Sequence, residues 1–225
     1  MPAKVINLTV HGIGKPPRDL EPGEDGTWVT VEQFEQVMDA VIGRPDVHIT
    51  FDDGNSSDIE IALPRLLERG LTAEFFVLAG LLGEPGRLDR ADVRELEAAG
   101  MRIGSHGWSH RDWRRVNFPQ AVEEMVTAPR VLAEVIGHPV TRVAVPFGSY
   151  DRLVLGRLRY AGASLVYTSD GGAARPESWM QARTSLRHDI DPSWTADVLA
   201  GQPGLRREAR RFAAGLVKRT RGPAR

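Results

Sequence analysis

The sequence contains no cysteine and no long apolar run. Without cysteine, the chain can form neither a disulfide framework nor a thiolate metal site, and it has no cysteine nucleophile. It has no stretch of about 18 apolar residues, so we expect no transmembrane helix. Its first residues show no basic segment leading into an apolar run, so we expect no signal peptide and a cytoplasmic protein.

The chain as a whole also lacks an excess of charge of one sign, with a formal net charge of −1. Net charge therefore indicates no polyanionic partner, and no recognised nucleic-acid motif is present, so we expect no nucleic-acid partner. The exception is the segment 205–225, which has eight basic residues and one acid. We predict a basic helix or tail there, which either packs on the rest of the protein or contacts an anionic membrane surface.

Short apolar runs alternate with amphipathic stretches along residues 1–204, which we take as one domain. This alternation is typical of βα units and predicts a mostly parallel sheet, and the length fits an α/β barrel. Thr30 and Gln33 have the spacing of a helix capping box. After residue 168 we expect a less regular stretch, with no strand or helix assigned before the basic helix at about 205–218. We expect strands at 4–10, 47–51, 73–79, 101–105, 140–145 and 164–168, and helices at 31–42, 58–69, 90–99, 119–136 and 152–161.

Two short stretches carry most of the side chains suited to chemistry. Asp52 and Asp53 come at the end of one predicted strand, and His106 and His110 follow another. Loops after barrel strands form one mouth, so we expect these four side chains to meet there. Imidazoles and a carboxylate can hold a divalent cation, and the carboxylate left over can act as a base. We therefore interpret the chain as a metal-dependent hydrolase.

These stretches also resemble a known family. Thr50-Phe51-Asp52-Asp53-Gly54 resembles the first motif of the polysaccharide deacetylase family, also called the NodB-homology or carbohydrate esterase family 4 group. The stretch from His106 to His110 is similar to its second motif, and Val145-Pro146-Phe147-Gly148 is similar to its third. The resemblance covers about residues 5–188. It implies a distorted (β/α) barrel of NodB type and removal of N-acetyl groups from an amino sugar.

The resemblance implies a role for each matching residue. Asp52 would be the general base, and Asp53, His106 and His110 would hold the metal, usually zinc and sometimes cobalt or another divalent ion. The backbone N–H of Phe147 would stabilise the oxyanion. Two alternatives stay open on the same fold: hydrolysis of another amide or acyl group, such as formyl, and a catalytically silent carbohydrate-binding barrel.

Two positions depart from the family pattern. A serine or threonine usually follows the first histidine of the second motif, whereas this chain has Gly107, and Ser109 is a candidate replacement. An arginine that steadies the base usually lies at the position of Ala144. Arg183 is our candidate substitute, the alternative being that it forms a surface salt bridge.

Two histidines are candidates for the general acid. Leu186-Arg187-His188 fits the Leu-x-His pattern of the family's last motif, which makes His188 the first candidate. His11 follows the first predicted strand and is the second candidate. Aromatic rings near the motifs either stack on a sugar or pack at the rim. The residues predicted to line the substrate site are His11, Trp108, Pro146, Tyr150 and Arg183.

Overall fold

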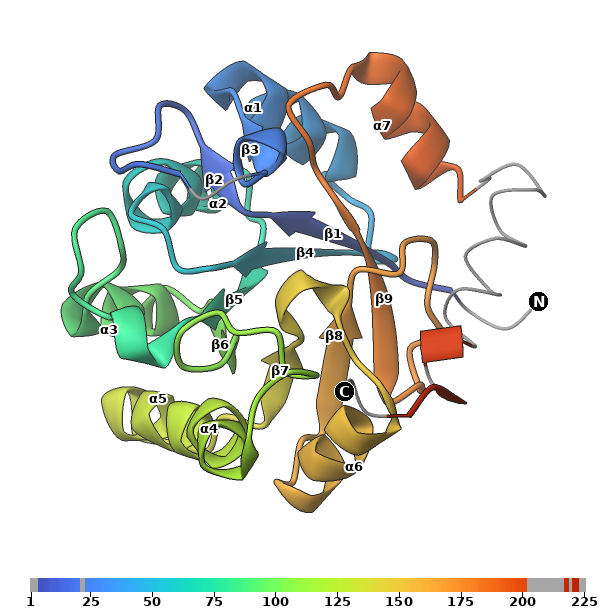
Figure 1. The fold of residues 1–225 in the computed structure, drawn as a ribbon. Helices are drawn as coiled ribbons and strands as arrows, with labels where there is room; N and C mark the ends of the chain where they lie inside the picture. Colours follow the sequence, from blue (N-terminus) through green and yellow to red (C-terminus); the bar gives the residue numbers. More distant parts are fainter. Residues whose placement is uncertain (1–3, 21–22, 202–216, 219, 223–225) are drawn as a thin grey trace.

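The computed structural model of the protein describes residues 4–20, 23–201, 217–218 and 220–222. Within these residues, seven parallel strands close a barrel in the order β1-β4-β5-β6-β7-β8-β9, and helices lie around its outside (Figure 1). The predicted single-domain (β/α) barrel is confirmed. Its strands are β1 Ile6–Val10, β4 Val47–Asp52, β5 Ala73–Val77, β6 Arg102–Ser105, β7 Arg142–Ala144, β8 Leu165–Thr168 and β9 Met180–Ser185.

The helices follow the strands along the chain, as βα units require. A separate pair of short parallel strands, β2 (Gly12–Ile13) and β3 (Trp28–Val29), stands beside the barrel. The helices are α1 Val31–Val41, α2 Leu63–Glu68, α3 Arg90–Ala98, α4 Phe118–Val122, α5 Ala128–Ile136, α6 Arg152–Tyr160 and α7 Pro192–Leu199. The capping box on α1 is confirmed, since the Thr30 hydroxyl accepts from Gln33 N and the Gln33 side chain accepts from Thr30 N.

Side chains alternate between the two faces of the barrel wall. On β1, Leu8 and Val10 belong to the apolar core that the helices cover. Between them, the Thr9 hydroxyl lies 3.1 Å from that of Thr50 on β4. On β5, the buried Glu74 accepts a hydrogen bond from the Tyr167 hydroxyl. The apolar core therefore lies between strands and helices, while polar side chains meet inside the barrel.

The stretch after residue 168, which we expected to be less regular, contains two regular elements that the sequence analysis did not assign. The structure has β9, which pairs with both β8 and β1 and so closes the barrel, and it has α7. The two buried positions of β9 are Gln181 and Arg183. Because these inward side chains are polar, the strand lacks the apolar alternation on which strand prediction depends.

Two of the predicted helices contain a π-helical segment, one at its start and one in its middle. The predicted helix 58–69 begins with the π-helix η2 (Asp58–Ala62) before α2, and the predicted helix 119–136 contains η4 (Glu123–Thr127) between α4 and α5. Each segment carries one fully buried carboxyl side chain, Asp58 in η2 and Glu124 in η4. Short π-helical segments of this kind are frequent at functional sites.

The predicted basic helix at 205–218 lies mostly outside the described residues, so its contact with a membrane stays a prediction. Two described residues near the end of the chain contact the barrel. Lys218 Nζ lies 2.8 Å from Asp170 Oδ1, and the Arg221 side chain donates to the Tyr150 carbonyl. In the part of the chain that the structure describes, every helix is too short or too polar to span a bilayer.

Candidate functional site

The predicted site residues meet at the carboxyl ends of the strands. Asp52 is the last residue of β4, and Asp53 follows it. His106 directly follows β6, and Phe147 lies in the turn after β7. Because the strands are parallel, all of these positions face the same mouth of the barrel.

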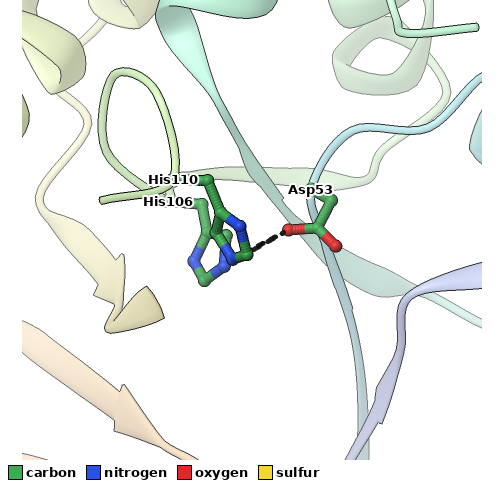
Figure 2. Close-up of side chains that lie close together, drawn as sticks. All are labelled: Asp53, His106 and His110. Carbon is green, nitrogen blue, oxygen red and sulfur yellow. Dashed lines mark ion pairs between the residues drawn. The ribbon is translucent and has the colours of Figure 1, made fainter. Parts of the chain in front are cut away.

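Asp53, His106 and His110 form a compact group with metal-ligand chemistry (Figure 2). Asp53 Oδ1 lies 3.5 Å from His106 Nε2 and 3.5 Å from His110 Nε2, and the three candidate ligand atoms all lie within 4.8 Å of one another. Asp53 Oδ1 is buried and accepts no hydrogen bond from any described residue. A buried carboxylate oxygen without a donor is costly, and a cation shared with the two imidazoles would satisfy it.

The His106 ring is held in a fixed orientation. Its Nδ1–H donates to the Ala144 carbonyl oxygen at 2.9 Å, which leaves Nε2 as the acceptor that faces Asp53. Metal-binding histidines commonly have such a backbone partner on the other ring nitrogen. Burial lowers the pKa of His106 to about 4, so the ring is neutral near pH 7, as a ligand must be.

Backbone strain is concentrated in this site. Among the described residues, three non-glycine residues have positive φ: Asp53 (76°), His110 (57°) and Phe147 (56°). Non-glycine side chains rarely adopt this region, and such conformations persist where the surrounding structure enforces them, often at functional sites. All three belong to the predicted site.

Asp52 is paired with Arg183. Arg183 Nη1 lies 2.7 Å from Asp52 Oδ1, Nη2 lies 2.6 Å from Oδ2, and Nη1 also donates to the Thr50 hydroxyl. Both side chains are buried, with exposed fractions of 2% for Asp52 and 1% for Arg183. Burial raises the pKa of Asp52, but the Arg183 guanidinium and the two neighbouring histidines together outweigh burial and hold that pKa well below its usual range.

Two aromatic rings and a small residue make room for this guanidinium. Arg183 Cζ lies 5.3 Å from the centre of the Phe76 ring and 5.7 Å from that of Tyr167. Ala144 packs against the same two rings. A longer side chain at position 144 would compete with Arg183 for this part of the barrel interior.

The two candidate acids lie in different surroundings. His11 Nε2 is 4.0 Å from Asp52 Oδ2, and its Nδ1 is buried without a hydrogen bond to any described residue. His188 is exposed, and its Nδ1 lies 3.3 Å from the Gly26 carbonyl oxygen. Within the described residues, His188 forms no hydrogen bond or ion pair with Asp52 or the metal-ligand group. Of the two candidates, His11 is thus the one with a polar contact to the base within 4.0 Å.

The remaining predicted substrate residues differ in exposure. Phe147 is 60% exposed, and its ring centre lies 4.2 Å from that of His110, while Pro146 in the same turn is buried. Trp108 packs against Gly80, where an added Cβ would lie 2.4 Å from the indole. For Tyr150 the structure differs from our expectation, because the residue is fully buried and its hydroxyl donates to Asp170 at 2.7 Å.

Sequence analysis missed two residues that support the site. The Asn55 side chain donates to the His11 carbonyl and accepts from Arg18 and Arg87, so it joins the loop after β1 to the loop after β4. Glu124 accepts hydrogen bonds from the loop between the two histidines. An asparagine after Asp-Asp-Gly has the composition of a plain turn, and a glutamate within a helix usually faces solvent, so neither gave a signal.

Comparison with known proteins gives matches over most of this fold. A family model described as polysaccharide deacetylase matches residues 41–166, more than half of the chain. The chitooligosaccharide deacetylase of Bradyrhizobium sp. (strain ANU 289) is 27% identical over 166 residues, which are 73% of this chain and 69% of that protein. The peptidoglycan-N-acetylglucosamine deacetylase of Bacillus cereus is 25% identical over 135 residues, 57% of this chain and 47% of that protein. Two further relatives, both from Bacillus subtilis (strain 168), are 26% and 29% identical, and the chain spans about half of their length, 50% and 54%.

Solved structures agree at the level of the fold. The Streptococcus pyogenes deacetylase PplD in complex with acetate has a TM-score of 0.75 at 19% identity, covering 88% of this chain and 99% of that chain. At this identity the likeness shows the architecture of the barrel.

Proposed function

Because this chain belongs to the polysaccharide deacetylase family, we propose that it is a metal-dependent hydrolase that removes the N-acetyl group from an amino sugar. The observation that carries the proposal is the position of Asp52 beside the metal-ligand group: Asp52 Oδ2 lies 3.9 Å from His106 Nε2, on the side of the barrel mouth. A base next to a cation site is the arrangement that activates water.

Asp53, His106 and His110 would hold a divalent cation, with zinc as the first candidate because imidazole and carboxylate are ordinary zinc ligands. When bound, the cation would lower the pKa of a water molecule and polarise the acetyl carbonyl. Cobalt or another divalent ion suits the same ligands, since metal selection also depends on availability.

Asp52 is the proposed general base. Its pKa, held low by Arg183, keeps the carboxylate ionised at neutral pH, and Oδ2 is the oxygen nearest to the metal-ligand group. It would take a proton from the attacking water while the new C–O bond forms. Arg183 is the proposed positioning residue for this carboxylate, because its two-point contact fixes both oxygens.

His11 is the proposed general acid. The C–N bond breaks only if the leaving amine receives a proton, and His11 Nε2 lies 4.0 Å from Asp52 Oδ2. The backbone N–H of Phe147 would donate to the oxyanion. The exposed Phe147 ring beside His110 offers an apolar surface to a sugar ring. The products would be acetate and a free amino sugar.

The carbohydrate class of substrate rests on the relatives, whose names include a chitooligosaccharide deacetylase and a peptidoglycan-N-acetylglucosamine deacetylase. The test is acetate release from polymeric, oligomeric and nucleotide-linked N-acetylated sugars, with metal-stripped protein before and after zinc or cobalt is added. Release that depends on the metal supports the proposal. A tightly bound metal without acetate release would favour another acyl group, and the absence of both would favour a silent carbohydrate-binding barrel.

A further inference from the structure

The loop between the two histidine ligands is bound to one buried carboxylate. Glu124 Oε2 accepts from the backbone N–H of Trp108 at 2.7 Å and from the Trp113 indole N–H at 3.2 Å. Glu124 Oε1 accepts from the backbone N–H of Ser109 at 3.3 Å and from its hydroxyl at 3.1 Å. Four donors thus converge on a side chain that has no exposed surface.

This arrangement suits an ionised carboxylate, which can accept at both oxygens. Each of the two oxygens accepts two of the hydrogen bonds, and three of the four donors are N–H groups that cannot act as acceptors. Hydrogen bonds to an ionised acceptor are about twice as strong as neutral ones, which offsets the cost of burying the charge. Glu124 lies in the π-helical segment η4, which interrupts the regular turns between α4 and α5.

The loop conformation and the carboxylate also fit each other sterically. Gly107 has a φ of 92°, and a Cβ added there would lie 2.3 Å from Glu124 Oε2. Gly107 is the position at which the chain departs from the serine or threonine usual in the family's second motif. Ser109 instead supplies the hydroxyl, and its bond goes to Glu124.

We infer that Glu124 is the positioning residue of the metal site, and the inference rests on the proposed function. Glu124 holds Trp108 and Ser109 so that the chain enters His110 with a φ of 57° and both imidazoles face Asp53. The carboxylate itself is not a ligand, since it acts on the loop between the ligands. Its effect is to order the site before the cation arrives, so that binding does not have to order the loop.

The test compares Glu124→Gln with Glu123→Gln. Glutamine has nearly the same shape as glutamate, but one of its two terminal groups is an NH2 that cannot accept. This NH2 would face at least one loop N–H that donates to Glu124 in the wild type. Glu123 is the matched control, because it lies next to Glu124 in the same segment and pairs at the surface with Arg111, whose Nη1 also lies 3.7 Å from Glu124 Oε1. We expect the zinc Kd of Glu124→Gln to rise by about 10- to 100-fold, the range known for partners of metal ligands. Glu123→Gln should bind zinc like the wild type.

A second readout does not depend on the metal. In zinc-free protein, the Trp108 and Ser109 amides should exchange hydrogen faster in Glu124→Gln than in wild type, with exchange in β4 and β5 unchanged. If Glu124→Gln does not fold, Ser109→Ala removes one of the four bonds and should raise the zinc Kd by about threefold. Unchanged zinc Kd and unchanged amide exchange would overturn the inference. A wild type that binds neither zinc nor cobalt nor another divalent ion would instead overturn the proposed function.

Discussion

Arg183 and Asp52 lie 131 positions apart in the chain and form a buried pair joined by two hydrogen bonds, of 2.7 and 2.6 Å. The pair sets both the direction and the charge of the carboxylate that we propose as the base. Arg183 reaches it from β9, and the small Ala144 leaves space for the guanidinium between Phe76 and Tyr167. Strand β9 thus supplies the arginine that the third motif lacks at Ala144.

Arg183→Lys should lower kcat by about 100-fold, because lysine keeps the charge but loses the two-point contact that fixes the carboxylate. Burial then raises the pKa of Asp52 with less opposition, so the acid limb of the kcat/KM profile should move to higher pH. Zinc content should stay at the wild-type level, since Arg183 contacts none of the three ligands. A profile that keeps its acid limb, with unchanged kcat, would contradict the positioning role.

Asp52→Asn and Asp53→Asn should separate the base from the ligand. Asp52→Asn should keep its zinc and lose acetate release by at least about 100-fold, since the amide cannot take a proton from water. Asp53→Asn should lose zinc, because the buried Oδ1 that faces both imidazoles is the charged ligand. Metal content measured by elemental analysis, beside acetate release, checks both. Full activity of Asp52→Asn would show that another group is the base.

His11→Gln and His188→Gln should differ in activity. His11 lies 4.0 Å from the proposed base, and its loss should lower kcat by about 100-fold or more. His188 is exposed and bonds to the Gly26 carbonyl, so its loss should change kcat by less than about threefold. An assay on a substrate with an activated leaving group provides the control, because a good leaving group does not need the acid and should restore the His11→Gln rate. The reverse order of effects would assign the acid to His188.

The local parts of this site could be predicted from the sequence, and the long-range contacts could not. Asp53, His106 and His110 follow strands with a clear apolar pattern, and parallel strands bring such positions to one mouth. In contrast, β9 has polar inward side chains, Gln181 and Arg183, because the inside of this barrel is polar. The apolar alternation that identifies a strand was absent there, so the element and its pairing with β1 were missed.

The role of Glu124, which lies in a helical segment, could not be predicted from the sequence either. Its neighbour Glu123 is partly exposed, and two adjacent acids in an amphipathic stretch indicate a solvent-facing surface. The π-helical segment changes which side chains point inward, and we know of no sequence pattern that predicts such a segment. The buried carboxylate therefore became evident only from its hydrogen bonds.

Asp58→Asn should stabilise the protein at alkaline pH. Asp58 is fully buried, and neither carboxyl oxygen has a hydrogen bond to a described residue. Burial, followed by the nearby charge of Asp53, raises the pKa of Asp58 well above its usual value of 3.8. At pH values between the unfolded and the folded pKa of Asp58, the native state binds more protons than the unfolded state. The contribution of Asp58 to stability is therefore fully present below the unfolded pKa. It is lost as the pH rises through the folded pKa.

Asparagine has nearly the same shape and does not ionise, so the variant escapes this loss. On metal-stripped protein, we expect the Tm of Asp58→Asn to exceed that of the wild type by about 3 °C at pH 8.5, as a gain of about 1 kcal/mol gives for a chain of this size. The difference should shrink toward zero at about pH 4.5, near the ordinary carboxyl pKa. Asp25→Asn at an exposed position is the control and should show no pH-dependent difference. A Tm difference that is the same at both pH values would mean that folding does not raise the pKa of Asp58 and that this carboxyl is ionised across the range.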